Sequence, residues 1–260
     1  NSVFTVVEVT DRHIGGPTPN QSHGAVMEYR LNSSYTGNFP GGDFGDFNNY
    51  ENALVIYAWD GGTGTATLSS DATEYPMLWF QGGNLNNRII QFPDADVTVN
   101  GRVNINGGIR LRVNNNSSKT LRFKNDVQIG SGCCGAGIFE FNGNSTANQT
   151  VIIEGDFDFN ATNGGTFQLF NNSGANTHKL IVNGDIDVPA SGTINFGDGS
   201  NSVVNLELQG LTSNAFTNTG SVNLHRIIMN KGKNQSNSFT FQDNFNLSGS
   251  TNGVNKAISI

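Results

Sequence analysis

One nine-residue pattern recurs along the chain and limits its fold more than any other feature. Each copy has an apolar–any–apolar triplet, a three-residue corner of polar residues or glycine, and a second such triplet. The copies are "VTVNGRVNI" (97–105), "LRFKNDVQI" (121–129), "VIIEGDFDF" (151–159), "LIVNGDIDV" (180–188) and, more loosely, "FTFQDNFNL" (239–247). With the half-match "LELQGL" (206–211), successive copies start 24 to 33 residues apart. A period of this length is typical of solenoids.

A third short element follows most copies: "GGIRL" (107–111), "GIFEF" (137–141), "GTFQL" (165–169), "GTINF" (192–196) and "GSVNL" (220–224). Each unit therefore has three alternating strands that are too short to bury an apolar face alone. Units stacked in parallel would pair their backbones and join their inward residues into one core. We therefore predict an all-β fold, a three-sided parallel β-helix with coils of about 24–33 residues. An antiparallel sandwich is the alternative, but it explains the alternation without explaining the period.

The predicted register makes specific inward ladders. Leu121, Val151, Leu180 and Leu206 should stack on one face, and Val127, Phe157 and Ile186 on the next. Phe139, Phe167, Ile194 and Val222 should stack on the third face. The segment "HRIIMNKGKNQSNS" (225–238) lies outside the pattern and is expected to be an extra strand or a bulging loop.

The first part of the chain has a different composition. All five tyrosines and both tryptophans lie before residue 80. We predict an N-terminal cap or irregular, aromatic-rich region over residues 1–51, and a β-helix over residues 52–260 that continues beyond the last residue. The aromatic side chains would cover the open end of the core. Alternatively, Tyr35, Tyr50 and Trp59 would be exposed and bind a glycan or a partner, because aromatic rings stack on sugars and anchor interfaces.

Charge and hydropathy exclude two classes of partner. The net charge is −7, and binding to nucleic acid needs clustered Lys and Arg to neutralise phosphates. We therefore expect no nucleic-acid partner. The sequence has no run of about 18 apolar residues, so no membrane insertion is expected.

Four carboxylates converge in the predicted register. Asp156 and Asp185 would stack at the corner, and Asp158 and Asp187 would stack on the outward face of the next strand. Like charges that stack directly repel each other, so the group is a solvated face, a calcium site or a catalytic pair. Calcium prefers six to eight oxygen ligands, and no other cofactor is expected. A glycosidase would need one of these acids to have a raised pKa.

The two cysteines, Cys133 and Cys134, are adjacent in "GSGCCGAG". Two cysteines alone do not make a zinc site. They form either a vicinal disulfide, which is a strained ring, or two small thiols in a glycine-rich corner.

Residues 86–260 resemble a known family of repeats. The segments "NNRIIQFPDADVTVNGRVNI" and "LHRIIMNKG", with the repeated "NGD" corners, resemble the β-strand-repeat regions of large secreted surface proteins of Bacteroidota. Such proteins are exported by the type IX system and include adhesins. The resemblance implies an extracellular, cell-surface location and no catalytic residues. The sorting domain of that family is absent from this sequence, which leaves the export route open.

These observations predict a non-enzymatic extracellular module, a stalk or adhesin segment of a bacterial surface protein. Its partners would be other segments of the same long chain, a surface polysaccharide or another surface protein. The alternatives are a β-helical polysaccharide lyase or glycoside hydrolase that uses the four aspartates, and a carbohydrate-binding module that uses the N-terminal aromatic residues.

Overall fold

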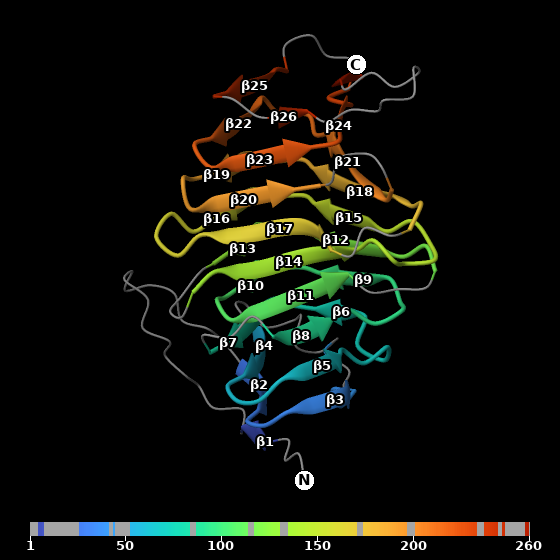
Figure 1. The fold of residues 1–260 in the computed structure, drawn as a ribbon, viewed down its shortest axis with the longest axis vertical. Coiled ribbons are helices and arrows are strands. Elements are labelled where there is room, and N and C mark those ends of the chain that lie inside the picture. Colours follow the sequence, from blue (N-terminus) through green and yellow to red (C-terminus); the bar gives the residue numbers. More distant parts are fainter. Residues whose placement is uncertain are drawn as a thin grey trace.

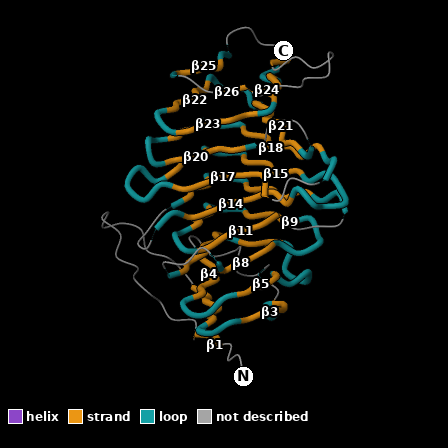
Figure 2. Tube along the Cα trace, in the orientation of Figure 1, coloured by secondary structure: helices purple, strands orange, loops and turns teal. Residues whose placement is uncertain are grey.

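A computed structural model describes residues 5–7, 26–41, 44, 53–83, 87–113, 117–130, 135–170, 174–196, 201–232, 237–243, 246–247 and 258–259. These residues form strands, turns and connecting segments arranged as three sheets. Every strand pair is parallel except the first. The chain winds from sheet to sheet, and its coils stack along the long axis of the molecule (Figures 1 and 2). The predicted three-sided parallel β-helix is therefore confirmed.

Each full coil contributes one strand to each sheet. Sheet A contains β1 (Thr5–Val7), β2 (Val26–Leu31), β4 (Leu54–Trp59), β7 (Met77–Gly82), β10 (Val103–Ile105), β13 (Val127–Ile129), β16 (Phe157–Phe159), β19 (Ile186–Val188), β22 (Asn214–Asn218) and β25 (Phe239–Gln242). Sheet B contains β3 (Tyr35–Asn38), β5 (Gly64–Thr67), β8 (Arg88–Gln91), β11 (Ile109–Val113), β14 (Gly137–Asn142), β17 (Gly165–Phe170), β20 (Gly192–Asn195), β23 (Ser221–Leu224) and β26 (Asn246–Leu247). Sheet C contains β6 (Glu74–Tyr75), β9 (Val97–Val99), β12 (Thr120–Phe123), β15 (Thr150–Ile153), β18 (Thr177–Val182), β21 (Val203–Leu208), β24 (Arg226–Met229) and β27 (Ile258–Ser259).

The predicted ladders pair in register. Val151 pairs with Leu121 on one side and with Leu180 on the other, and Leu180 pairs with Leu206. The ladders of sheets A and B pair in the same way. All of these side chains are buried. Successive strand residues point to opposite faces of a sheet, so the alternating apolar residues of all three sheets meet in one core.

The last coils differ from the predicted alignment. The repeat pattern predicts strands of sheets C and A in "FTFQDNFNL", but β25 lies in sheet A and β26 in sheet B. The sheet C strand of this coil is β24, in which Ile227 is fully buried and pairs with Leu206. The apolar run at residues 227–229 therefore belongs to the repeat. β24 follows β23 after a single residue, His225, so the sequence has no loop that would separate the two strands.

The coils also begin before the boundary expected at residue 52. β2 pairs in parallel with β4, and β3 pairs in parallel with β5. β1 pairs antiparallel with β2 at the first edge of sheet A. Aromatic rings fill the core here: the ring of Tyr57 stacks on that of Tyr29, with centroids 5.2 Å apart, and the centroid of Phe39 lies 4.7 Å from that of Tyr57.

None of the described residues forms a helix long and apolar enough to span a membrane.

Candidate functional site

Three aspartates connect successive coils at the corner between sheets C and A. The backbone N–H of Asp156 donates to Asp126 Oδ1 at 2.9 Å, and that of Asp185 donates to Asp156 Oδ1 at 2.8 Å. The N–H of Ala215 then donates to Asp185 Oδ1 at 2.9 Å. We call Asp126, Asp156 and Asp185 the corner aspartates. Each carboxylate accepts a backbone amide from the next coil, which satisfies a donor that a corner would otherwise leave unpaired.

The glycine before Asp156 and Asp185 makes these bonds possible. A Cβ atom on Gly155 would lie 2.4 Å from Asp126 Oδ1, and one on Gly184 would lie 2.4 Å from Asp156 Oδ1. Contacts this short are strongly repulsive, so any larger residue would displace the carboxylate. The repeated Gly-Asp corner is thus explained by packing between coils, because the glycine of one coil makes room for the aspartate of the coil before it.

Asp158 lies next to these corners on the outer face of sheet A. It pairs with Gln128 on one side and with Asp187 on the other, so the predicted stacking of Asp158 on Asp187 is confirmed. Partial burial raises the pKa of Asp158 to about 6, and the charges of Asp156, Asp126 and Asp187 add to this increase. Arg102 opposes it. Asp158 is therefore partly protonated in mildly acidic solution, whereas an exposed aspartate is ionised.

This geometry adds little support to the hypothesis of a calcium site. In the part of the chain that the structure describes, no three His, Cys, Asp or Glu side chains are grouped so that they could hold a metal ion. Asp156 and Asp185 also direct one oxygen each at a backbone amide. Calcium binding by Asp156, Asp158, Asp185 and Asp187 stays a prediction from the sequence.

The aromatic candidates are in different environments. Trp59 is fully buried, and its Nε1 donates to the carbonyl oxygens of Gly61 (2.7 Å) and Ser33 (3.0 Å). It therefore has no exposed ring on which a sugar could stack. Tyr35 is partly exposed, and its hydroxyl donates to the carbonyl oxygen of Asn38 at 2.7 Å. Tyr50 lies outside the described residues.

The cysteine hypothesis concerns a corner that is not described. Cys133 and Cys134 both lie outside the described residues. The vicinal disulfide therefore stays a prediction.

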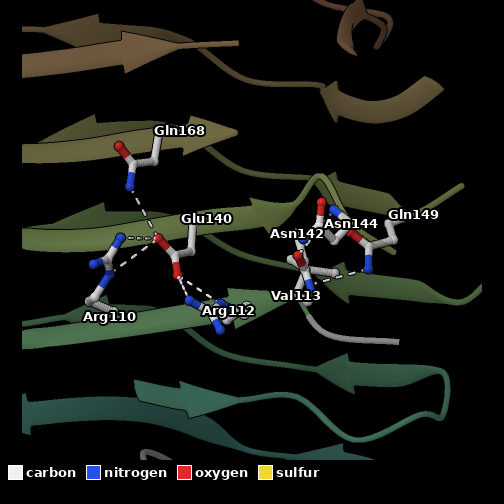
Figure 3. Close-up of polar contacts among 8 residues, drawn as sticks. All are labelled: Arg110, Arg112, Val113, Glu140, Asn142, Asn144, Gln149 and Gln168. Carbon is white, nitrogen blue, oxygen red and sulfur yellow. Dashed lines mark hydrogen bonds and ion pairs between the residues drawn. The ribbon is translucent and has the colours of Figure 1, made fainter. Parts of the chain in front are cut away.

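A second charged cluster lies on the outer face of sheet B, and the sequence pattern did not indicate it (Figure 3). The side chain of Glu140 is 0% exposed and lies between two arginines. Arg110 Nη2 donates to Glu140 Oε2 at 2.8 Å, and Arg112 Nε donates to Oε1 at 2.8 Å. Gln168 Nε2 donates to Oε2 at 3.1 Å from the next coil. The aromatic ring of Phe170 lies 4.8 Å from Cζ of Arg110 and 4.5 Å from that of Arg112.

This cluster satisfies a buried carboxylate completely. Both oxygens of Glu140 accept charged hydrogen bonds, and the guanidinium groups also contact an aromatic face. The cluster could have been found from the strand register, because Arg112, Glu140 and Gln168 pair directly on three adjacent strands of sheet B. The arrangement is suited to holding adjacent coils together, because these partners of Glu140 come from the strand before it and the strand after it.

Comparisons of the chain with protein-family models, curated proteins and solved structures gave no match.

Proposed function

We propose that this chain is a non-enzymatic structural or adhesive module, a stalk or adhesin segment of an extracellular bacterial surface protein. The observation that supports the proposal is the use of the corner aspartates. Two of them, Asp156 and Asp185, could from the sequence have been catalytic or calcium-binding, but their carboxylates accept backbone amides of the next coil. Carboxylates used in this way link successive coils of the stack.

The resemblance to surface proteins of Bacteroidota suggests where such a stack would act. The chain would lie outside the cell, and the resemblance implies type IX export as its route. Its partners would be neighbouring segments of the same long chain, and a surface polysaccharide or another surface protein. The described coils form a continuous stack, which suits a spacer because each coil contacts mainly its neighbours.

The first test separates binding from turnover. The purified chain is incubated with a panel of acidic and neutral polysaccharides, and new reducing ends and unsaturated uronates are measured beside equilibrium binding. We expect no turnover with any polymer. Turnover by the wild-type chain that is lost in Asp158→Asn, and retained in the control Thr217→Ala on the same outward column, would overturn the proposal.

A second test examines the mechanical role. The chain is pulled between its two ends in a single-molecule experiment, and we expect the coils to detach in steps because stability is distributed over neighbouring repeats. Asp156→Ala removes the acceptor for the amide of Asp185 and should lower the force of one step. Asp156→Asn keeps an acceptor oxygen at that position and should not. Equal forces in all three proteins would contradict the structural role of the corner aspartates.

One observation favours a second candidate, a β-helical glycoside hydrolase or lyase. The raised pKa of Asp158, about 6, is a property of a general acid. Asp187, which pairs with it on the next strand, would be the second carboxylate of a hydrolase. This candidate predicts turnover in the polysaccharide panel with an optimum in mildly acidic solution.

A further inference from the structure

Lys231 lies just after β24 and is largely buried, with 8% of its surface exposed. Its side chain reaches back across the corner to the preceding coil. Nζ donates to Asn214 Oδ1 at 2.6 Å and to the carbonyl oxygen of Gln209 at 2.6 Å. Lysines are rarely buried without a paired charge, yet both of these partners are neutral, and one of them is a side-chain carboxamide.

The same carboxamide contacts an acid on its other side. Asn214 Nδ2 donates to Asp185 Oδ1 at 3.1 Å. These contacts define the orientation of the amide, because the lysine can only donate to an oxygen and the carboxylate can only accept from the nitrogen. The structure therefore aligns an amine, an amide carbonyl and a carboxylate in a row, contributed by residues from three successive coils.

The surroundings favour a reactive amine. One contact opposes this: the ring centroid of Phe239 lies 5.5 Å from Nζ and favours the charged form of the amine. Burial lowers the pKa of Lys231, although the charge of Asp185 partly opposes this effect. A lowered pKa increases the fraction of the neutral amine, which is the nucleophilic form. The hydrogen bond also holds Nζ 2.6 Å from Oδ1, the oxygen bonded to the carbon that it would attack, and such proximity strongly accelerates reactions between fixed groups.

We propose that Lys231 and Asn214 join in an intramolecular amide cross-link. The neutral Nζ attacks Cγ of Asn214, and a new C–N bond forms. The new bond places both nitrogens on Cγ. Asp185, which is hydrogen-bonded to Nδ2, then takes the proton that Nζ loses and passes it to Nδ2, which leaves as ammonia when the original C–N bond breaks. One carboxamide and one amine thus give one secondary amide and one ammonia, and the reaction needs no oxidant and no cofactor.

The cross-link would close one coil covalently. The two residues are 17 positions apart, and the chain between them passes through β22, β23 and β24. Joining them ties the start of one coil to the start of the next at the same corner as the corner aspartates. A closed loop of this kind stabilises the folded state by restricting the unfolded chain. The cross-link does not depend on the proposed function.

The decisive measurement is the intact mass of the purified chain. We expect it to be one ammonia below the mass calculated from the sequence, and a tryptic digest should contain a branched peptide that joins Lys231 to Asn214. Lys231→Met should restore the calculated mass and remove the branched peptide. The control Lys179→Met should leave both signals unchanged, because Nζ of Lys179 pairs with the carboxylate of Glu207 rather than with an amide.

Two further variants test the chemistry. Asn214→Asp should form the same cross-link with loss of water in place of ammonia. Asp185→Asn keeps an oxygen for the amide of Ala215 but cannot transfer the proton, and should slow the cross-linking roughly a hundredfold. The proposal is overturned if the wild-type chain keeps its calculated mass and gives only linear peptides, both when fresh and after prolonged incubation in mildly alkaline buffer. That outcome does not depend on whether any variant folds.

Discussion

His178 in β18 should make the stability of the protein depend on pH. Its side chain is fully buried, and its Nδ1 accepts the backbone N–H of Gln149 at 3.1 Å. The imidazole ring stacks on Phe141, with centroids 5.4 Å apart. Burial lowers the pKa of His178 from 6.5 to about 4. Protonation would place a charge in the core and remove the lone pair that accepts the hydrogen bond.

The size and the sign of the effect follow from linkage between protonation and folding. In the unfolded chain this imidazole takes up a proton below pH 6.5, whereas in the folded chain it does so only below about 4. Between these values the unfolded state binds more protons, so the free energy of unfolding decreases as the pH falls. The difference of about 2.5 pKa units corresponds to about 3 kcal/mol. This stability is fully present above pH 6.5 and is lost by about pH 4.

The assay compares denaturant unfolding of the wild-type chain and His178→Asn across this pH range. The asparagine oxygen can still accept the amide of Gln149, but the side chain does not titrate. The variant should be less stable at neutral pH because it loses the ring packing, and it should lose about 3 kcal/mol less than wild type on acidification. If the two proteins lose the same free energy, or if NMR gives a pKa near 6.5 for His178, the reasoning is refuted.

Three other substitutions test the corner and the charged cluster. Asp158→Asn should raise the free energy of unfolding at neutral pH by about 1–2 kcal/mol once solvent screening is allowed for. Folding favours the protonated form of this group. The gain in stability should therefore be absent below pH 3.8, the ordinary pKa of the carboxyl, and should develop as the pH rises through about 6. Equal stabilities of the two proteins at all pH values would contradict this. Gly184→Ala should destabilise the chain by about 1–3 kcal/mol, because its Cβ would lie 2.4 Å from both Asp156 Oδ1 and the carbonyl oxygen of Gly155; a thermal melt unchanged from wild type would show that the corner can expand. Glu140→Gln should lower the free energy of unfolding, measured with denaturant, by about 3 kcal/mol, since it leaves two arginines without their buried counter-charge. A change below about 0.5 kcal/mol, the range of ordinary surface substitutions, would mean that the cluster is solvated.

Much of the fold could be predicted from the pattern of the sequence. Alternation with a period of two assigns each apolar residue to the inside of a strand, and the repeat stacks like residues on like. The pairing of Phe157 with Ile186, and of Asp158 with Asp187, follows from these two rules. The rules failed at β24 and β25, where a sheet C strand follows sheet B after one residue. There the length of the corner, which no periodicity specifies, decided the register.

The chemistry of the polar side chains depended on the tertiary structure. The sequence predicted Asp156 and Asp185 beside one another, but only the stacking of the coils shows that each accepts an amide from the next coil. Trp59 and Lys231 are likewise buried by residues far away in the sequence. Alternation depends on each residue and its immediate neighbours, so the sequence reveals it. Hydrogen-bond partners and burial depend on which coils are adjacent and how closely they approach, and only the folded chain brings those groups together.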